Sequence, residues 1–182
     1  YIREAIPYYE KLDYPDFEII ILPDEKQDEQ LSDKLDIKVV VSGKVGPAEK
    51  RDLGAEHANG EILAFTDDDA FPSPDWLKSA LPYFEEDAVG AVGGPAVTPE
   101  SDGFWQKVSG AVYANFMTSG HYRRRYVAVG DRVVEDYDLP SVNLIIRKEV
   151  FEEIGGFDST FYPGEDTKLC LEIKKLGFKI LY

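Results

Sequence analysis

The chain has 182 residues, of which 43% are apolar and 13% aromatic, and its formal net charge is −15. This length and apolar content suit one globular domain with a hydrophobic core and exclude an intrinsically disordered chain. The negative charge argues against binding nucleic acid or an anionic membrane through overall electrostatic attraction. The single cysteine, Cys170, excludes an intrachain disulfide, and its apolar helical surroundings favour a buried thiol.

Predicted strands and helices alternate over the first half of the chain. The strands are expected over residues 17–22, 37–41, 62–65 and 88–97. The helices are expected over residues 2–12, 48–58 and 74–84. Alternation at this length indicates βαβ units, and fully apolar strands indicate that both faces of the sheet are covered. We therefore predict an α/β fold with three α/β/α layers and a mixed, mostly parallel central sheet.

Residues 99–140 interrupt this alternation. An amphipathic helix is predicted over residues 104–117, and the only basic cluster of the chain follows it, with His121 and Arg123–Arg125. The cluster is a candidate to meet a diphosphate, another anionic ligand or a lipid surface; the other interpretation is a solvated loop. We expect Trp105 of the helix to serve in packing rather than as a platform for a ligand.

Regular structure returns after an acidic, loop-like stretch over residues 127–139. The predicted elements are a strand over residues 141–147, helices over 148–154 and 165–176, and a last strand over 178–182. Gly177 is expected to cap the second of these helices. No run of the chain approaches the ~18 apolar residues that a membrane span needs, so no span is expected here.

The most informative motif is Asp67-Asp68-Asp69, which directly follows the apolar strand at residues 62–65. Adjacent carboxylates repel one another, so folding gains nothing from this placement unless a cation binds. Mg²⁺ and Mn²⁺ take oxygen ligands from one or two carboxylates and from substrate phosphates. Ligands of open α/β sheets bind beyond the carboxyl ends of the strands. The motif therefore predicts a metal–phosphate site, with Asp68 on the opposite side if strand geometry persists.

Two groups of motifs resemble the family 2 glycosyltransferases. Those of the donor half lie at residues 46–48 (Gly-Pro-Ala), 51–54 (Arg-Asp-Leu-Gly) and 65–77 (beginning Phe-Thr-Asp-Asp-Asp). Those of the acceptor half lie at residues 143–149 (beginning Asn-Leu-Ile-Ile-Arg), 155–158 (Gly-Gly-Phe-Asp) and 164–166 (Gly-Glu-Asp). The resemblance covers nearly the whole chain and implies the Rossmann-like GT-A fold of the nucleotide-diphospho-sugar transferases.

The resemblance also implies how the chain is organised. A single catalytic domain is expected over residues 1–182, with a donor half at 1–98, a variable insert at 99–140 and an acceptor half at 141–182. Both ends are expected to be trimmed, since the family's first strand would lie before Tyr1. Two further positions depart from the family pattern. An acidic pair usually ends the second strand, and here only its second member, Asp24, is acidic. The usual R-N-x-G carries Asp52 in place of Asn.

The activity that the resemblance implies is transfer of a sugar from a nucleotide diphosphate donor to an acceptor hydroxyl, with inversion. A bound Mn²⁺ or Mg²⁺ would neutralise the leaving diphosphate. Asp69 is then the direct metal ligand, and Asp67 binds the metal or the ribose. Asp166 is the expected general base that takes the proton of the acceptor hydroxyl, with Glu165 as the second candidate. Both also suit the start of a helix, where acidic residues are favoured as caps.

Further donor contacts are expected from Asp24, for the nucleotide base, and from Asp68. Lys44 and Arg51 flank the start of a helix, where backbone N–H groups favour phosphate, although Arg51 also suits an ordinary solvent-facing position. The partners implied are a UDP- or GDP-sugar and a saccharide or lipid-linked acceptor, with no nucleic acid. Membrane association is expected only through parts outside this sequence, and the location is expected to be cytoplasmic or at the cytoplasmic face of a membrane.

Several other functions share parts of this pattern. Phosphoryl transfer of the haloacid-dehalogenase type also starts from D-x-D, but it needs a Thr where this chain has Phe71. A sugar-phosphate nucleotidyltransferase shares the acidic sheet end but opens with a Gly-rich basic loop. A non-catalytic acidic domain that binds metal or carbohydrate has no use for a carboxylate on a later helix. A glycosyltransferase-like domain without activity also stays open.

Overall fold

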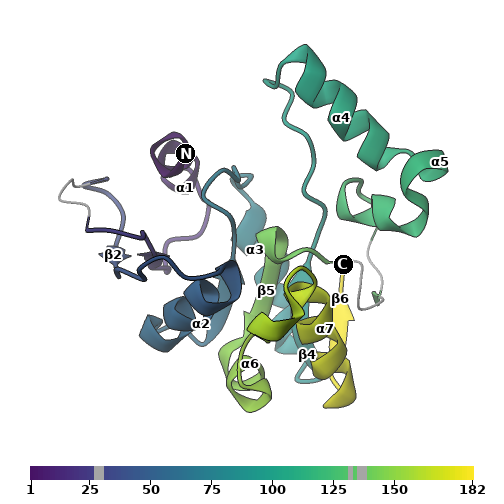
Figure 1. Ribbon diagram of the computed structural model, residues 1–182. Helices are drawn as coiled ribbons and strands as arrows, with labels where there is room; N and C mark the ends of the chain where they lie inside the picture. The colour runs from purple at the N-terminus through teal and green to yellow at the C-terminus, as the bar shows by residue number, and fades with distance from the viewer. Residues whose placement is uncertain (27–30, 131–132, 135–138) are drawn as a thin grey trace.

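The computed structural model describes residues 1–26, 31–130, 133–134 and 139–182 (Figure 1). Its helices are α1 (Ile2–Tyr9), α2 (Pro47–His57), α3 (Trp76–Ala80), α4 (Phe104–Ala114), α5 (Phe116–Ser119), α6 (Lys148–Ile154) and α7 (Glu165–Lys175). Its strands are β1 (Ile19–Ile21), β2 (Ile37–Val39), β3 (Ile62–Phe65), β4 (Val89–Gly93), β5 (Leu144–Arg147) and β6 (Lys179–Leu181). Short 3₁₀ helices are η1 (Leu81–Glu85), η2 (Gly120–Arg125), η3 (Ser141–Asn143) and η4 (Ser159–Phe161).

Most predicted elements are present, and two predicted helices are broken for identifiable reasons. The helix expected over residues 74–84 divides into α3 and the 3₁₀ helix η1, because Pro82 has no N–H to continue the α-helical pattern. The helix expected over residues 104–117 stops at Asn115, whose side chain accepts a hydrogen bond from the Met117 N–H and starts α5. The loop expected over residues 127–139 lies partly outside the described residues.

The strands form two sheets. β1 and β2 pair in parallel, and the second sheet has the order β3-β5-β4-β6. In the second sheet β3, β4 and β6 point the same way, whereas β5 runs against them between β3 and β4. The sheet is therefore mixed, as predicted, and mostly parallel in strand direction. Most of its strand pairings are nevertheless antiparallel, because the reversed strand β5 lies between β3 and β4 and pairs with both.

This reversal brings distant segments to one edge of the sheet. Leu144 at the start of β5 is paired with Phe65 at the end of β3 and with Gly93 at the end of β4. The residues that follow β3 and β4 and those that precede β5 therefore meet at a single edge. A Cβ on Gly93 would lie 2.4 Å from the Asn143 carbonyl oxygen, so only glycine allows this close approach.

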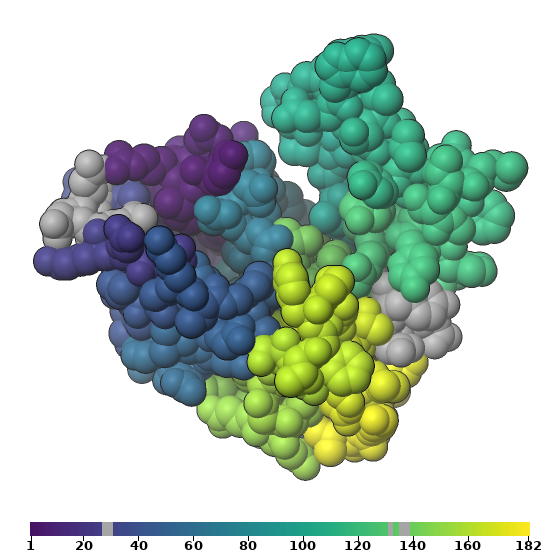
Figure 2. Space-filling model, in the orientation of Figure 1, coloured from purple at the N-terminus to yellow at the C-terminus, as the bar shows by residue number. Residues whose placement is uncertain are grey.

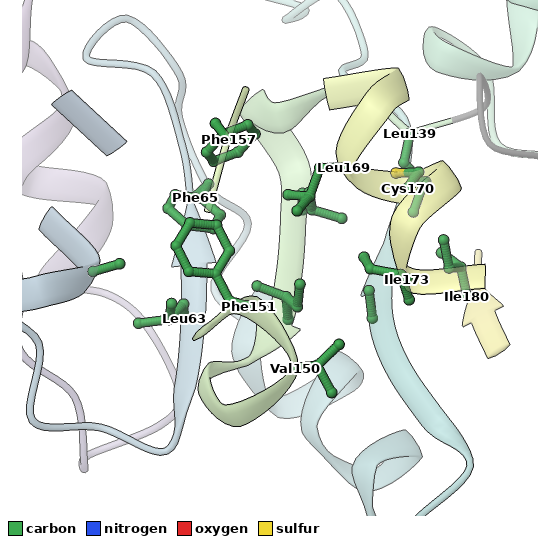
Figure 3. Close-up of a cluster of buried hydrophobic side chains, with 14 of the residues drawn as sticks. Leu63, Phe65, Leu139, Val150, Phe151, Phe157, Leu169, Cys170, Ile173 and Ile180 are labelled. Atoms are coloured by element: carbon green, nitrogen blue, oxygen red, sulfur yellow. The ribbon is translucent and has the colours of Figure 1, made fainter. Parts of the chain in front are cut away.

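Helices cover both faces of the four-stranded sheet, so the predicted three layers are present. Alternate residues of each strand point to opposite faces: Leu144 and Ile146 join one buried cluster, and Ile145 joins the other. The first cluster is formed with α2, α6 and α7, and Figure 3 shows Leu169, Cys170 and Ile173 of α7 among its members. The second cluster is formed with α3 and η1. The predicted buried thiol of Cys170 is confirmed.

The segment of α4, α5 and η2, residues 104–125, projects from this body (Figure 1). Trp105 is 77% exposed and touches the neighbouring ring of Phe104. The expectation that Trp105 serves in packing is therefore wrong, because its helix turns that side away from the core. None of the helices in the described part of the chain is both long and apolar enough to span a bilayer.

Candidate active site at the sheet edge

The three aspartates after β3 lie at the edge where β3, β4 and β5 meet. The strand ends at Phe65, and the chain turns at Asp68 and Asp69, with the Ala70 N–H donating to the Asp67 carbonyl at 3.2 Å. Asp68 and Asp69 are exposed, whereas Asp67 is partly buried. The strand geometry on which the expected alternation of these side chains depended therefore does not continue past Phe65. A turn separates the like charges and leaves the last two carboxylates toward solvent.

Arg51 of α2 joins the two acidic motifs. Its Nη2 donates to Oδ1 of Asp67 at 3.1 Å, and its Nη1 donates to Oε1 of Glu165 at 3.1 Å. The arginine side chain is only 15% exposed and lies over the ring of Phe157, 5.5 Å from its centre. Arg51 was predicted to meet phosphate or to face solvent. The structure shows it as a buried bridge between the donor-half and acceptor-half motifs.

The two acidic residues at the start of α7 have different surroundings. Glu165 is buried, and its second oxygen accepts the Gly164 N–H at 3.0 Å. Asp166 accepts a hydrogen bond from Nη2 of Arg125 at 2.9 Å and, through its other oxygen, from the Thr167 N–H at 2.7 Å. Glu165 is thus occupied in holding Arg51 in place. Asp166 is held by a residue of the projecting segment.

Arg125 is a site residue whose pairing was not predicted. Its guanidinium contacts Asp166 and the Leu139 carbonyl, and its own carbonyl accepts the Ala96 N–H at 2.8 Å. The sequence feature that pointed to Arg125 was the only basic cluster in a strongly acidic chain, at residues 121–126. That signal indicated an anionic partner, but the partner is a carboxylate of the same chain rather than a diphosphate.

Asp52 of α2 holds the loop that follows α6. Its Oδ1 accepts the Phe157 N–H at 2.8 Å, and burial raises the pKa of the Asp52 carboxyl above its usual range. Gly156 has φ +86°, and a Cβ there would lie 2.6 Å from Oδ1 of Asp52. The Gly-Gly-Phe-Asp motif is therefore needed for close approach of backbone to carboxylate. Aspartate accepts this bond as asparagine would, so the departure from R-N-x-G leaves the contact possible.

Asn143 is a second residue of the edge whose role was not predicted. Its side-chain oxygen accepts from Nε1 of Trp76 at 2.9 Å, and its amide nitrogen donates to the Pro95 carbonyl at 3.4 Å. These bonds join α3, the segment after β4 and the segment before β5. Trp76 itself packs against the second buried cluster.

A groove of about 1840 Å³ runs from this edge between β1 and β3. The predicted donor-binding and metal residues all line it: Asp24, Lys44, Arg51, Asp67, Asp68 and Asp69. Asp24 is paired with Lys50 of α2, which also lines the groove. The groove exceeds the roughly 300–1,000 Å³ of ordinary ligand sites, because it continues along the apolar strands. Its polar end at the aspartates is the candidate donor site. Glu165 and Asp166 are not among the lining residues; Glu165 is connected to the groove through its bond to Arg51.

The donor atoms at the groove's polar end are of the kind that a hard divalent cation prefers. Asp67 and Asp69 offer carboxylate oxygens next to the groove, and Arg51 holds Oδ1 of Asp67. In the described part of the chain, no three His, Cys, Asp or Glu side chains converge as a complete ligand set. These residues therefore fit a cation that takes its remaining ligands from water or phosphate, as Mg²⁺ and Mn²⁺ do.

The model of glycosyl transferase family 2 matches residues 1–155. The chain belongs to this family. It is 29% identical over 137 residues to a pre-mycofactocin glycosyltransferase of Mycobacterium tuberculosis, which covers 75% of this chain and 28% of the relative. The resemblance to family 2 is thereby confirmed, and the interpretations as a nucleotidyltransferase or a phosphoryl-transfer enzyme lose their support.

Solved structures show the same fold. A mannosyltransferase of Pyrobaculum calidifontis in complex with GDP-Man and Mn²⁺ has a TM-score of 0.69 at 21% identity, over 98% of this chain and 49% of that one. Residues 1–349 of S. aureus TarS in complex with UDP-GlcNAc have a TM-score of 0.66 at 19% identity, over 99% of this chain and 52% of that one. The predicted GT-A fold is thus confirmed. The chain spans about half the length of these structures and about a quarter of the curated relative.

Proposed function

We propose that this domain transfers a sugar from a nucleoside diphosphate sugar to an acceptor hydroxyl, with inversion and with the help of a divalent cation. The observation that carries the proposal is the Arg51 bridge between Asp67 and Glu165. It joins the strand-end aspartates to the start of α7, two motifs nearly one hundred positions apart. A donor site and an acceptor site need this proximity, because the reacting atoms must approach one another in one geometry.

The donor would bind at the polar end of the groove. Asp69 and Asp67 would hold Mn²⁺ or Mg²⁺, which neutralises the diphosphate when it is bound. Lys44 and Lys50 lie along the same groove and supply positive charge for phosphate oxygens. The structures of similar fold bind GDP-Man with Mn²⁺ in one case and UDP-GlcNAc in the other. We therefore propose a UDP- or GDP-sugar as the donor.

The acceptor hydroxyl must lose its proton as it attacks. Asp166 is the proposed general base, and Arg125 would orient its carboxylate through the bond to Oδ2. Glu165 would act through Arg51 rather than on the acceptor, because its side chain is the more buried of the two, 8% exposed against 15% for Asp166, and is bonded to Arg51. The proposed acceptor is a saccharide or a lipid-linked sugar, and the proposed location is cytoplasmic or at the cytoplasmic face of a membrane.

Release of nucleotide from UDP- and GDP-sugars, with and without Mn²⁺, tests the proposal. We expect Mn²⁺-dependent release from one nucleotide class, lost in Asp69→Ala. Asp87→Ala is the matched control, because Asp87 is also exposed but does not line the groove. Release that is equal in Asp69→Ala and wild type, or that is independent of metal, would contradict the proposal.

A further inference from the structure

The projecting segment exposes large apolar side chains to solvent. Phe104, Trp105 and Met117 are 72%, 77% and 89% exposed, and Phe116 is 57% exposed. Figure 2 shows this segment standing out from the body beside a hollow in the surface. Scattered exposed apolar residues are ordinary, but a group of them on one segment indicates an interaction surface.

The apolar side of helix α4 faces away from the body of the domain. Its small residue Gly110 faces the body, since a Cβ there would lie 1.9 Å from Oγ1 of Thr98. At about 100° per residue, Phe104, Val108 and Val112 lie on the opposite side of the helix. Val108 and Val112 are also exposed. A helix of a globular domain normally buries this stripe, so its outward direction requires a partner outside the described fold.

The charge of the same segment is opposite to that of the rest of the chain. Residues 104–130 contain no Asp or Glu, although the whole chain has 35 in 182 residues. They contain Lys107 and Arg123–Arg125, so the remainder of the chain carries a net charge of −19. Positive charge beside an exposed aromatic stripe is the composition of helices that lie in the surface of an anionic bilayer.

We propose that α4, α5 and η2 form a docking surface for an anionic lipid membrane. Phe104, Trp105 and Phe116 would enter the boundary between headgroups and acyl chains, which aromatic side chains favour. Lys107 and Arg123 would lie against lipid phosphates, whereas Arg125 stays bonded to Asp166. The acidic body is repelled by the same surface, and this fixes which side of the molecule faces the membrane.

A second copy of the chain is the main competing occupant. The apolar stripes of two copies could pack against each other, but this arrangement would bring the two basic segments together, and like charges repel. Contact of the segment with the acidic body of a second copy would meet no comparable apolar group. The other exposed large apolar side chains in the described residues are spread over the fold, as with Tyr8, Val39 and Phe161. A bilayer satisfies the charge and the stripe together.

Vesicle flotation tests the proposal without reference to catalysis. The probes are vesicles of phosphatidylcholine alone and of phosphatidylcholine mixed with phosphatidylglycerol. We expect binding to the mixed vesicles, weaker at high salt, with a blue shift of tryptophan emission. Trp105→Phe should keep most of the binding and lose the shift, because the remaining Trp76 is bonded inside the fold.

Charge variants complete the test. Trp105→Glu should reduce vesicle binding by about tenfold or more, whereas Leu176→Glu at the far end of α7 should not. Leu176 is 41% exposed, so both variants add a negative charge at an exposed site, and circular dichroism checks that both fold. No binding, or equal loss in both variants, would overturn the proposal. So would a dimer, seen by sedimentation, that Trp105→Glu abolishes while no vesicle binding occurs.

Discussion

The sheet edge and the projecting segment differ in whether their side chains have partners within the chain. At the edge, Arg51, Asp67 and Glu165 are paired with one another across distant parts of the sequence. In the segment, Phe104 and Trp105 face solvent. The charged side chains of the edge thus have partners within the chain, including Arg125 of the segment, whereas the aromatic side chains of the segment are exposed. The paired residues build the site, and the exposed aromatic residues are proposed to bind a membrane. Variants at the edge should therefore change turnover or stability, and variants of the exposed aromatic residues should change vesicle binding.

The largest expected effect is on turnover at the edge. Asp166→Asn should lower transfer to a soluble acceptor by roughly 10²–10⁴-fold, because the proposed general base is removed. Trp105→Glu should leave turnover with the same soluble acceptor unchanged. Steady-state rates of nucleotide release measure both. Equal rates for wild type and Asp166→Asn would remove Asp166 from the proposed chemistry.

Removing the bridge should be the next largest effect and should appear as lost stability. Arg51→Met leaves the buried Glu165 without its partner, and breaking a buried pair in this way costs about 3–5 kcal/mol. Lys34→Met breaks the exposed pair with Glu10 and should cost far less, because water screens charges at the surface. Urea unfolding followed by circular dichroism compares the two. Similar losses would show that the Arg51 bridge is no stronger than a surface pair.

Two neighbouring glycines of the loop after α6 give a smaller contrast. Gly156→Ala forces a Cβ against Asp52 at φ +86°, and we expect about 2–3 kcal/mol of destabilisation. Gly155→Ala, in the left-handed α region at φ +88° with open space around it, carries only the backbone cost of about 1–2 kcal/mol. Thermal unfolding of both variants measures the difference. A larger loss of stability in Gly155→Ala than in Gly156→Ala would contradict the close contact between Gly156 and Asp52.

The smallest expected effect is the pH dependence of stability at Asp52. Burial raises its pKa in the folded state, so its contribution is fully present below its unfolded pKa and is lost as the pH rises through the folded value. Asp52→Asn keeps an acceptor for the Phe157 N–H and does not titrate. The difference in unfolding free energy, variant minus wild type, should therefore grow in favour of the variant as the pH rises above about 4. A difference that is constant with pH would contradict the raised pKa.

The sequence predicted the core elements well because their patterns are local. The strand at residues 62–65 matches β3 because an apolar run marks it, and the helix at 148–154 matches α6 because a terminal glycine marks its end. The order of the strands was not predictable in the same way. The reversal of β5 depends on where the chain returns after residues 99–140, and no local pattern encodes that return.

Side-chain partners at the site were the least predictable feature. The aspartates and the Gly-Glu-Asp motif were identified from their types and spacing, but the pairing of Arg51 with both was not. A long side chain on a polar helix has the same local pattern whether it meets phosphate, solvent or a carboxylate. The amphipathic pattern at residues 104–117 likewise predicted a helix without predicting that its apolar side faces outward, because direction is set by contacts such as Gly110 with Thr98.

The most direct test of the central claim is calorimetric titration of the donor with and without Mn²⁺ on three proteins: wild type, Asp69→Ala and Asp166→Asn. The account predicts metal-dependent binding of one nucleotide class to wild type, its loss in Asp69→Ala and its retention in Asp166→Asn. Binding that does not depend on metal, or that falls equally in both variants, would contradict the assignment of donor and acceptor roles to the two motifs that Arg51 joins.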